Sequence, residues 1–168
     1  MGYMGVGKTT VGRILSESLQ MPFYDLDEVI ENRSGQTIPQ IFSIYGEPAF
    51  RAVESSALYW TTKRTEAVIA TGGGAPCYNQ NMHLIKQHGF SIYLKMDPSD
   101  LHKRLLSESS TRPRIANFDT SELMEFIQQE LKFRDPIYQE ADLIVDANRP
   151  LYDLKQDLLE YLRSNIIL

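Results

Sequence analysis

GYMGVGKT, residues 2–9, is the segment that decides the fold. Its spacing is G-x-x-x-x-G-K-T, with Gly2, Gly7, Lys8 and Thr9 at the defining positions. Glycines of this kind let backbone N–H groups surround a phosphate at a helix N-terminus, where the helix dipole also favours an anion. Lys8 suits the β- and γ-phosphates of a nucleotide, and the Thr9 hydroxyl suits Mg²⁺. The segment therefore predicts a nucleotide-binding loop that opens a helix.

The rest of the chain alternates between helical and strand patterns. Apolar residues recur at helical spacing from Val11 to Leu19, directly after the loop. We expect strands at residues 21–27, 66–74, 90–96 and 142–147. We expect helices at residues 9–20, 28–64 with breaks at Gly35 and Gly46, 79–89, 97–108, 121–141 with a disturbance at Pro136, and 150–164. This alternation predicts an α/β fold with three α/β/α layers around a central parallel sheet.

Composition bounds the class of protein. The 168 residues suit one domain, and 42% hydrophobic with 23% charged residues is typical of a soluble globular protein. A net charge of −5 argues against nucleic acid or an anionic membrane as a partner. Cys77 is the single cysteine, so no intrachain disulfide can form, which favours a reducing, cytoplasmic setting. The sequence has no apolar run long enough for a membrane span and no signal-peptide pattern.

Two aspartates follow the first predicted strand. Parallel strands end at one edge of the sheet, where ligands bind. The helix after the loop runs about 20 Å and the next strand returns about 17 Å, which brings Asp25 and Asp27 back beside the loop. The two aspartates alternate at the strand end, so their side chains need not face the same way. One can then hold Mg²⁺ through water while the other accepts a hydroxyl proton. The alternative is that both are solvated, or that one caps the helix beginning at Glu28.

A triple glycine and several arginines are further candidates. Gly72, Gly73 and Gly74 either let a ligand approach the backbone or form a tight turn after a strand. Arg51 lies one helical turn before Glu54, so it is either a ligand or half of a surface salt bridge. The other candidate arginines are Arg112, Arg114, Arg134 and Arg149. Arg112 lies in a proline-containing loop that can carry a guanidinium to a transferred phosphate.

Together these segments resemble the shikimate kinases, in the nucleoside-monophosphate-kinase branch of P-loop proteins. The resemblance covers essentially the whole chain. It rests on GYMGVGKTT, FYDLD, GEPAFRAVE, IATGGGAP, Arg112–Pro113 and FRDPIYQEA. It implies transfer of phosphate from MgATP to shikimate, giving ADP and shikimate 3-phosphate. It also implies one P-loop kinase domain over residues 1–168, with an acceptor-binding helical region near 28–64 and a lid loop near 107–121.

The resemblance further implies residue roles. Lys8, Asp27 and Arg112 would be catalytic, with Asp27 bonded to the reacting hydroxyl. Thr9 and Asp25 would hold Mg²⁺. The nucleotide would be bound by Gly5, Gly7, Lys8, Thr9, Thr10, Arg104, Arg112 and Arg149. Shikimate would be bound by Asp27, Arg51, Gly72, Gly73, Gly74 and Arg134, with Phe50 and Glu54 as supports.

Two features depart from the family pattern. Family members carry an apolar strand before the loop, and here Met1 alone stands in that place, so we expect about five to ten further apolar residues upstream. The lid contains RPRI, so Arg114 is a second candidate for the lid arginine.

Two alternative functions stay open at this point. The chain could be a related gluconate or nucleoside monophosphate kinase, or a nucleotide-binding module without turnover. We expect a monomer that acts on ATP and shikimate as small-molecule substrates.

Overall fold

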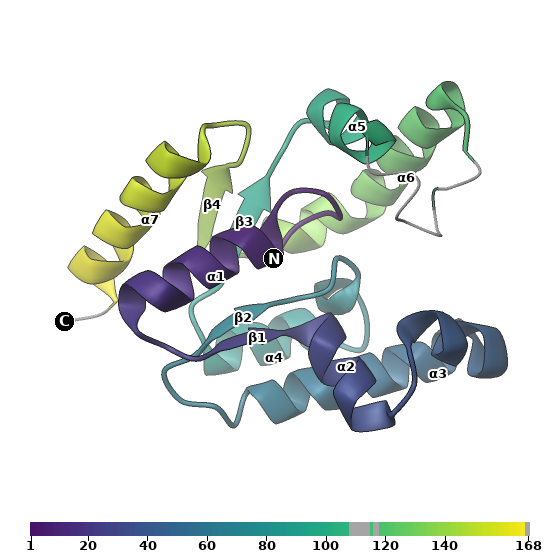
Figure 1. Cartoon of the computed structure of the whole chain (residues 1–168), viewed down its shortest axis with the longest axis horizontal. Helices are drawn as coiled ribbons and strands as arrows, with labels where there is room; N and C mark the ends of the chain where they lie inside the picture. The colour runs from purple at the N-terminus through teal and green to yellow at the C-terminus, as the bar shows by residue number, and fades with distance from the viewer. Residues whose placement is uncertain (108–114, 116–117, 167–168) are drawn as a thin grey trace.

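The computed structural model describes residues 1–107, 115 and 118–166. Helices and strands alternate along the chain, as the sequence predicts (Figure 1). The strands are β1 (Phe23–Asp25), β2 (Val68–Ala70), β3 (Ile92–Lys95) and β4 (Leu143–Asp146). The helices are α1 (Lys8–Leu19), α2 (Leu26–Ser34), α3 (Ile38–Thr61), the short 3₁₀ helix η1 (Ala75–Cys77), α4 (Asn81–His88), α5 (Pro98–Ser107), α6 (Thr120–Tyr138) and α7 (Leu151–Asn165).

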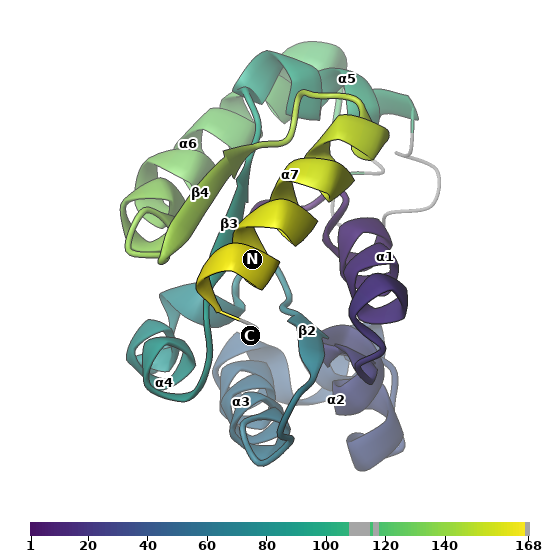
Figure 2. The ribbon, with the colours of Figure 1, turned by 90° about the vertical axis from the view of Figure 1, so that its left-hand side faces the viewer.

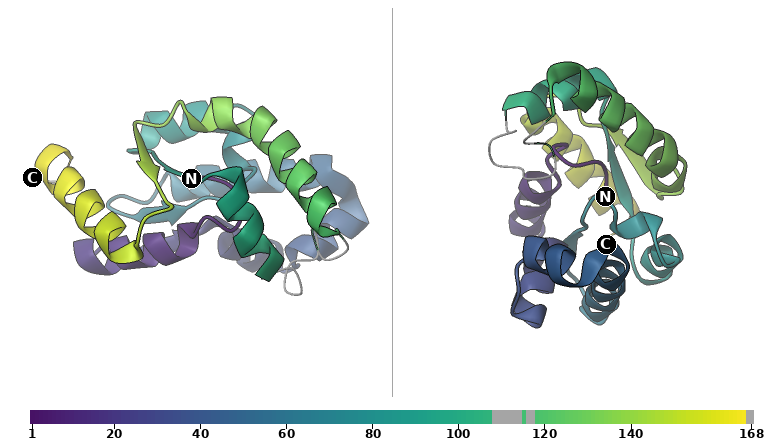
Figure 3. Two further views of the ribbon diagram at one scale, coloured as in Figure 1. Left: turned by 90° about the horizontal axis from the view of Figure 1, so that it is seen from above. Right: turned by 90° about the vertical axis from the view of Figure 1, so that its right-hand side faces the viewer.

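The strands form two parallel ladders. β1 pairs with β2 from Phe23↔Val68 to Asp25↔Ala70, and β3 pairs with β4 from Ile92↔Leu143 to Lys95↔Asp146. Helices α1 and α7 lie on one side of the strands, and α4 and α6 lie on the other (Figures 2 and 3). The α/β class, the parallel pairing and the layering are thus confirmed.

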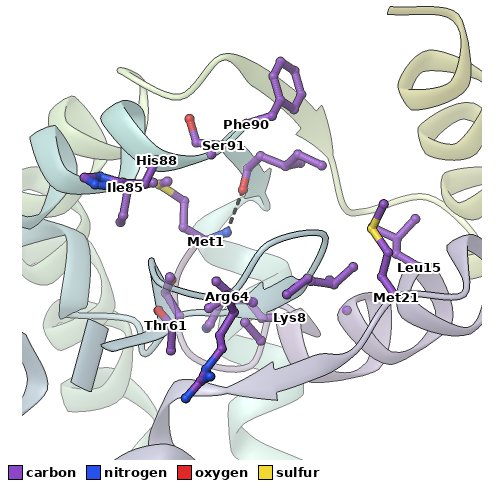
Figure 4. A pocket seen from close by; sticks show the side chains of 18 of the residues that line it. Met1, Lys8, Leu15, Met21, Thr61, Arg64, Ile85, His88, Phe90 and Ser91 are labelled. Atoms are coloured by element: carbon purple, nitrogen blue, oxygen red, sulfur yellow. Dashed lines mark hydrogen bonds between the residues drawn. The ribbon is translucent and has the colours of Figure 1, made fainter. Parts of the chain in front are cut away.

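A cavity divides the sheet between β2 and β3. These two strands are not paired with each other, and the space between them measures about 530 Å³ (Figure 4). Met1 lines this space, and its amine donates a 2.6 Å hydrogen bond to the carbonyl oxygen of Ile92 of β3. In the described part of the chain, the strands thus form two separate parallel pairs.

Side-chain caps fix several boundaries. Asp25 ends β1 and caps α2, because its carboxylate accepts a 3.0 Å bond from the Asp27 N–H. The predicted strand through residue 27 is therefore wrong by two residues, and Asp27 lies in the first turn of α2. Thr37 and Asp119 begin α3 and α6 with capping boxes.

The helical region between β1 and β2 breaks at the predicted glycines. Gly35 ends α2 with φ 69°, and Gly46 kinks α3 with φ 79°. Both values are in the left-handed region that glycine adopts without strain. Helix α6, by contrast, continues through Pro136 to Tyr138, so the disturbance expected there is absent.

Two apolar clusters hold the described elements together. One lies between α1, β3, α5, α6 and α7 and includes Leu94, Leu105, Ile127 and Leu158. The other packs α2 against α3 through residues such as Ile30 and Leu58. None of the helices in the described ranges is long and apolar enough to cross a membrane.

Candidate active site

The glycine-rich loop wraps the N-terminus of α1. Gly2, Gly5 and Gly7 have φ values of 140°, 79° and 96°, which side chains rarely allow. The Lys8 ammonium donates a 2.9 Å hydrogen bond to the Tyr3 carbonyl oxygen, so its side chain folds back over the loop. The loop thus has the backbone form that places N–H groups and a cation around an anion.

Thr9 and Asp25 lie in direct contact. The Thr9 hydroxyl donates a 2.7 Å hydrogen bond to Oδ2 of Asp25. This contact brings the end of β1 back to the first turn of α1, as the lengths of the helix and strand predict. A hydroxyl and a carboxylate are hard oxygen donors of the kind that Mg²⁺ prefers alongside phosphate oxygens. The pair therefore fits a magnesium site, although the described residues contain no group of three or more His, Cys, Asp or Glu that could hold a metal.

Asp27 and Glu54 face the backbone of Gly72. A Cβ atom on Gly72 would lie 2.9 Å from Oδ1 of Asp27 and 3.3 Å from Oε1 of Glu54. Burial raises the pKa of the Asp27 carboxyl, and the negative charges of Asp25 and Glu31 raise it further against the opposing effect of Lys8. Burial also raises the pKa of Glu54, while Arg51 lowers it. Asp27 is therefore a stronger base than a solvated aspartate.

Arg51 is buried in an ionic cluster. Its side chain donates to Glu54 at 2.8 Å and to Glu47 at 2.8 and 3.1 Å. Arg51 is 6% exposed and Glu54 is 2% exposed, so interpreting this pair as a surface salt bridge is wrong. A Cβ atom on Gly74 would lie 2.5 Å from Nη1 of Arg51, so any larger residue there would displace the guanidinium from its present position.

Arg134 lies beside the middle glycine. It is 2% exposed and pairs with Glu130 on the same helix. A Cβ atom on Gly73 would lie 3.5 Å from Nη1 of Arg134. Within the described ranges, Nε of Arg134 is buried without a hydrogen-bond partner. The three glycines thus face different charged side chains: Asp27 and Glu54 at Gly72, Arg134 at Gly73 and Arg51 at Gly74.

A sequence model of the family described as shikimate kinase matches residues 4–163. The chain belongs to the shikimate kinase family. A shikimate kinase of Bacteroides fragilis is 40% identical over 148 residues, which are 88% of this chain and 83% of that protein.

Two solved structures of the family support the same assignment. The shikimate kinase of Bacteroides thetaiotaomicron has a TM-score of 0.93 and 37% identity, covering 97% of this chain and 96% of that one. The shikimate kinase of Acinetobacter baumannii in complex with shikimate has a TM-score of 0.88 and 37% identity, covering 99% and 92%. The fold is therefore that of the family's P-loop kinases.

The other described residues that the resemblance implies for the nucleotide side are exposed. Arg104 is exposed on α5, and Thr10 is exposed on α1. Arg149 is exposed and pairs with Asp157 of α7 at 2.6 Å. Arg112 and Arg114 lie outside the described residues, as does most of the predicted lid loop.

Sequence reasoning missed three residues that touch this candidate site. Glu47 bonds Arg51, and its signal was the i, i+4 spacing within GEPAFR. The Tyr78 ring lies 3.9 Å from the guanidinium carbon of Arg51, and the Tyr138 hydroxyl donates to the Gly73 carbonyl. Tyr138 lies four residues after Arg134 on α6, which is a helical-neighbour spacing, whereas no spacing rule connects Tyr78 with Arg51.

Proposed function

We propose that this member of the shikimate kinase family transfers the γ-phosphoryl group of ATP to the 3-hydroxyl of shikimate. The products are ADP and shikimate 3-phosphate. The observation that carries the proposal is at Gly73. A Cβ atom there would lie 3.5 Å from Nη1 of Arg134 and 3.5 Å from the Met4 nitrogen of the glycine-rich loop. Arg134 and the glycine-rich loop therefore meet at Gly73.

The nucleotide side consists of the loop and the first turn of α1. Backbone N–H groups and Lys8 neutralise the β- and γ-phosphates. Thr9 and Asp25 would hold Mg²⁺, which when bound supplies positive charge to the phosphate oxygens. Gly5, Gly7, Thr10, Arg104 and Arg149 complete the proposed nucleotide contacts. Arg112, with Arg114 as the second candidate, is proposed as the lid arginine over the phosphates.

Asp27 orients the reacting hydroxyl and accepts its proton. Its carboxylate borders Gly72, one residue before the glycine that meets the phosphate loop. A carboxyl whose pKa is raised by burial holds a proton more readily than a solvated one, so it is better matched to this transfer.

Arg51 and Arg134 bind the carboxylate of shikimate. Both guanidinium groups are buried and border the glycine triplet, and a planar guanidinium can bind a carboxylate through two parallel N–H donors. Ion pairs hold the two arginines in place: Arg51 pairs with Glu47 and Glu54, and Arg134 pairs with Glu130. The backbone at residues 72–74 then meets the ring hydroxyls of shikimate.

The wider organisation is part of the proposal. Residues 1–168 form one kinase domain, with an acceptor-binding helical region near 28–64 and a lid near 107–121. We propose that it acts as a monomer in the cytoplasm, where ATP is available.

A coupled ADP-release assay with alternative acceptors tests the proposal. ADP should appear with shikimate at a kcat/KM at least about a hundredfold above that with gluconate or AMP. AMP has no carboxylate for the two arginines, and the open chain of gluconate does not hold its carboxylate and reacting hydroxyl in the fixed geometry of the shikimate ring. A preference for gluconate or AMP would favour the related small-molecule kinases. ADP binding without turnover of any acceptor would favour a nucleotide-binding module.

A further inference from the structure

The ion pairs of Arg51 use only part of its guanidinium. A guanidinium carries five N–H donors, two of them on each Nη atom. Nε and Nη2 donate to Glu47, and Nη1 donates to Glu54. The bonds to described residues therefore leave one N–H on Nη1 and one on Nη2. Two such donors bind both oxygens of a carboxylate only when the plane of the guanidinium contains the ligand.

The Tyr78 ring lies against the face of this guanidinium. Its centroid is 3.9 Å from the guanidinium carbon of Arg51. The Phe50 ring is farther away, at 5.1 Å, and belongs to the residue directly before Arg51 on α3. Close contact with an aromatic face restrains the plane of a guanidinium and adds a cation–π attraction. Of these two rings, that of Tyr78 is therefore the stronger restraint.

The segment that carries Tyr78 contacts the guanidinium at a second point. A Cβ atom on Gly74 would lie 2.5 Å from Nη1 of Arg51 and 3.0 Å from its guanidinium carbon. The 3₁₀ helix η1 begins directly after Gly74 and ends directly before Tyr78. One short segment thus supplies both the backbone and the ring that border the guanidinium.

The loop after Tyr78 is attached to α3 at Arg51 itself. The Asn79 side chain donates to the Arg51 carbonyl at 3.1 Å and to the Ser55 hydroxyl at 2.9 Å. Asn79 and Gln80 adopt φ values of 51° and 59°, which non-glycine residues rarely hold without such support. The loop conformation is therefore fixed by the same helix turn that carries the guanidinium.

Asn81 holds the same segment from the side of α4. Its N–H donates to the Tyr78 carbonyl at 2.9 Å, and its side chain donates to the Ala75 carbonyl at 2.8 Å. Asn81 is buried, so these bonds are shielded from competing water. The backbone of Tyr78 is thus bonded on both sides of the ring.

The Tyr78 ring also packs against α6. Its centroid lies 6.1 Å from that of Phe133, the residue directly before Arg134. Tyr78 therefore contacts both helices that carry the arginines proposed to bind the carboxylate, at Arg51 itself on α3 and at the neighbour of Arg134 on α6.

We infer that Tyr78 is a positioning residue that holds the plane of the Arg51 guanidinium, so that its two remaining N–H donors face the carboxylate of the acceptor. This inference rests on the proposed function, in which Arg51 binds shikimate. A ring that only filled space would contribute to stability and leave acceptor affinity unchanged. A ring that touched shikimate directly would contribute to affinity even without Arg51.

Steady-state kinetics of Tyr78→Leu, with Tyr78→Phe as the matched control, test this role. The leucine variant should raise KM for shikimate about 3- to 30-fold, the range that cation–π energies span, while kcat and KM for ATP stay within about twofold. The phenylalanine variant keeps the ring and should behave as the parent. Thermal unfolding checks that each variant is folded. Tyr78→Met, whose flexible side chain adapts to the same space, carries the same expectation if the leucine variant is unfolded.

A double-mutant cycle separates positioning from direct contact. If Tyr78 acts through Arg51, the change Tyr78→Leu should raise KM for shikimate by less than about twofold when it is added to Arg51→Ala. The same further rise as in the parent background would show that the ring acts on shikimate without Arg51, and would overturn the positioning role.

The single variants can also contradict the inference. An unchanged KM for shikimate in folded Tyr78→Leu, or an equal rise in KM for ATP, would overturn it, as would a Tyr78→Phe variant that behaves like Tyr78→Leu. Arg51→Ala tests the proposed function separately, because an unchanged KM for shikimate in that variant contradicts the binding role of Arg51 itself.

Discussion

The Thr9 hydroxyl donates a 2.7 Å hydrogen bond to the Asp25 carboxylate, and this bond joins the first turn of α1 to the end of β1. Asp25 also pairs with Ala70 across the β1–β2 ladder, two residues before Gly72. Asp25 therefore contacts the phosphate loop through its carboxylate and, through its backbone, pairs with the strand that leads into the glycine triplet.

Replacing Asp25 separates its charge from its capping role. Asp25→Asn keeps an N-cap side chain for α2, so Tm should change little, while loss of the charge should raise the Mg²⁺ concentration needed for half-maximal activity by at least about tenfold. Asp25→Ala should add a stability loss of about 1 kcal/mol from the missing cap. Mg²⁺ titrations of kcat and urea unfolding measure the two effects. A normal Mg²⁺ requirement in Asp25→Asn would contradict the metal role.

Asp27→Asn should lower kcat by at least about a hundredfold, because the reacting hydroxyl loses its base. Its stability at pH 7 should match or exceed that of the parent. A carboxyl with a raised folded pKa loses stabilising free energy as pH rises from 3.8 through the folded value, and asparagine removes that loss. Activity assays measure the fall in kcat, and thermal unfolding measures the stability. Near-normal turnover in a folded variant would exclude the catalytic role.

Lys8→Ala should abolish measurable turnover, because the transferring phosphoryl group loses a fixed positive charge. The variant also loses the hydrogen bond to the Tyr3 carbonyl, so ADP affinity should fall with it. Lys8→Arg is the matched control that keeps the charge with a different shape. Turnover of Lys8→Ala at a tenth of the parent rate or more would show that Lys8 is dispensable.

Arg51→Ala and Arg134→Ala should each weaken shikimate binding and leave ADP binding nearly unchanged. Loss of one partner of a buried charge pair typically costs about 2–5 kcal/mol. Calorimetric titration with each ligand measures the separation. Arg51→Lys is the control for charge without the planar fork. Should either alanine variant weaken ADP binding as much as shikimate binding, that arginine belongs to the nucleotide side.

The loop, the alternation of elements and the return of Asp25 could be predicted because they depend on local spacing. The burial of Arg51 and Glu54 could not, because their i, i+3 spacing is the same on a surface and in a core. What buries them is the segment at 72–78, about twenty residues away. The strand predicted at residues 21–27 wrongly includes Asp27, because the side chain of Asp25 caps a helix at the point where the apolar pattern suggests a continuing strand.

The glycine triplet limits how this pocket can evolve. An alanine at Gly72 would collide with Asp27 at 2.9 Å, and one at Gly74 would collide with Arg51 at 2.5 Å. At Gly73 the nearest atoms lie 3.5 Å away, which leaves room for a methyl group. A mutational path toward a different acceptor therefore has one first step that leaves the charged side chains in place, at Gly73, whereas an alanine on either side of it would displace the Asp27 carboxylate or the Arg51 guanidinium.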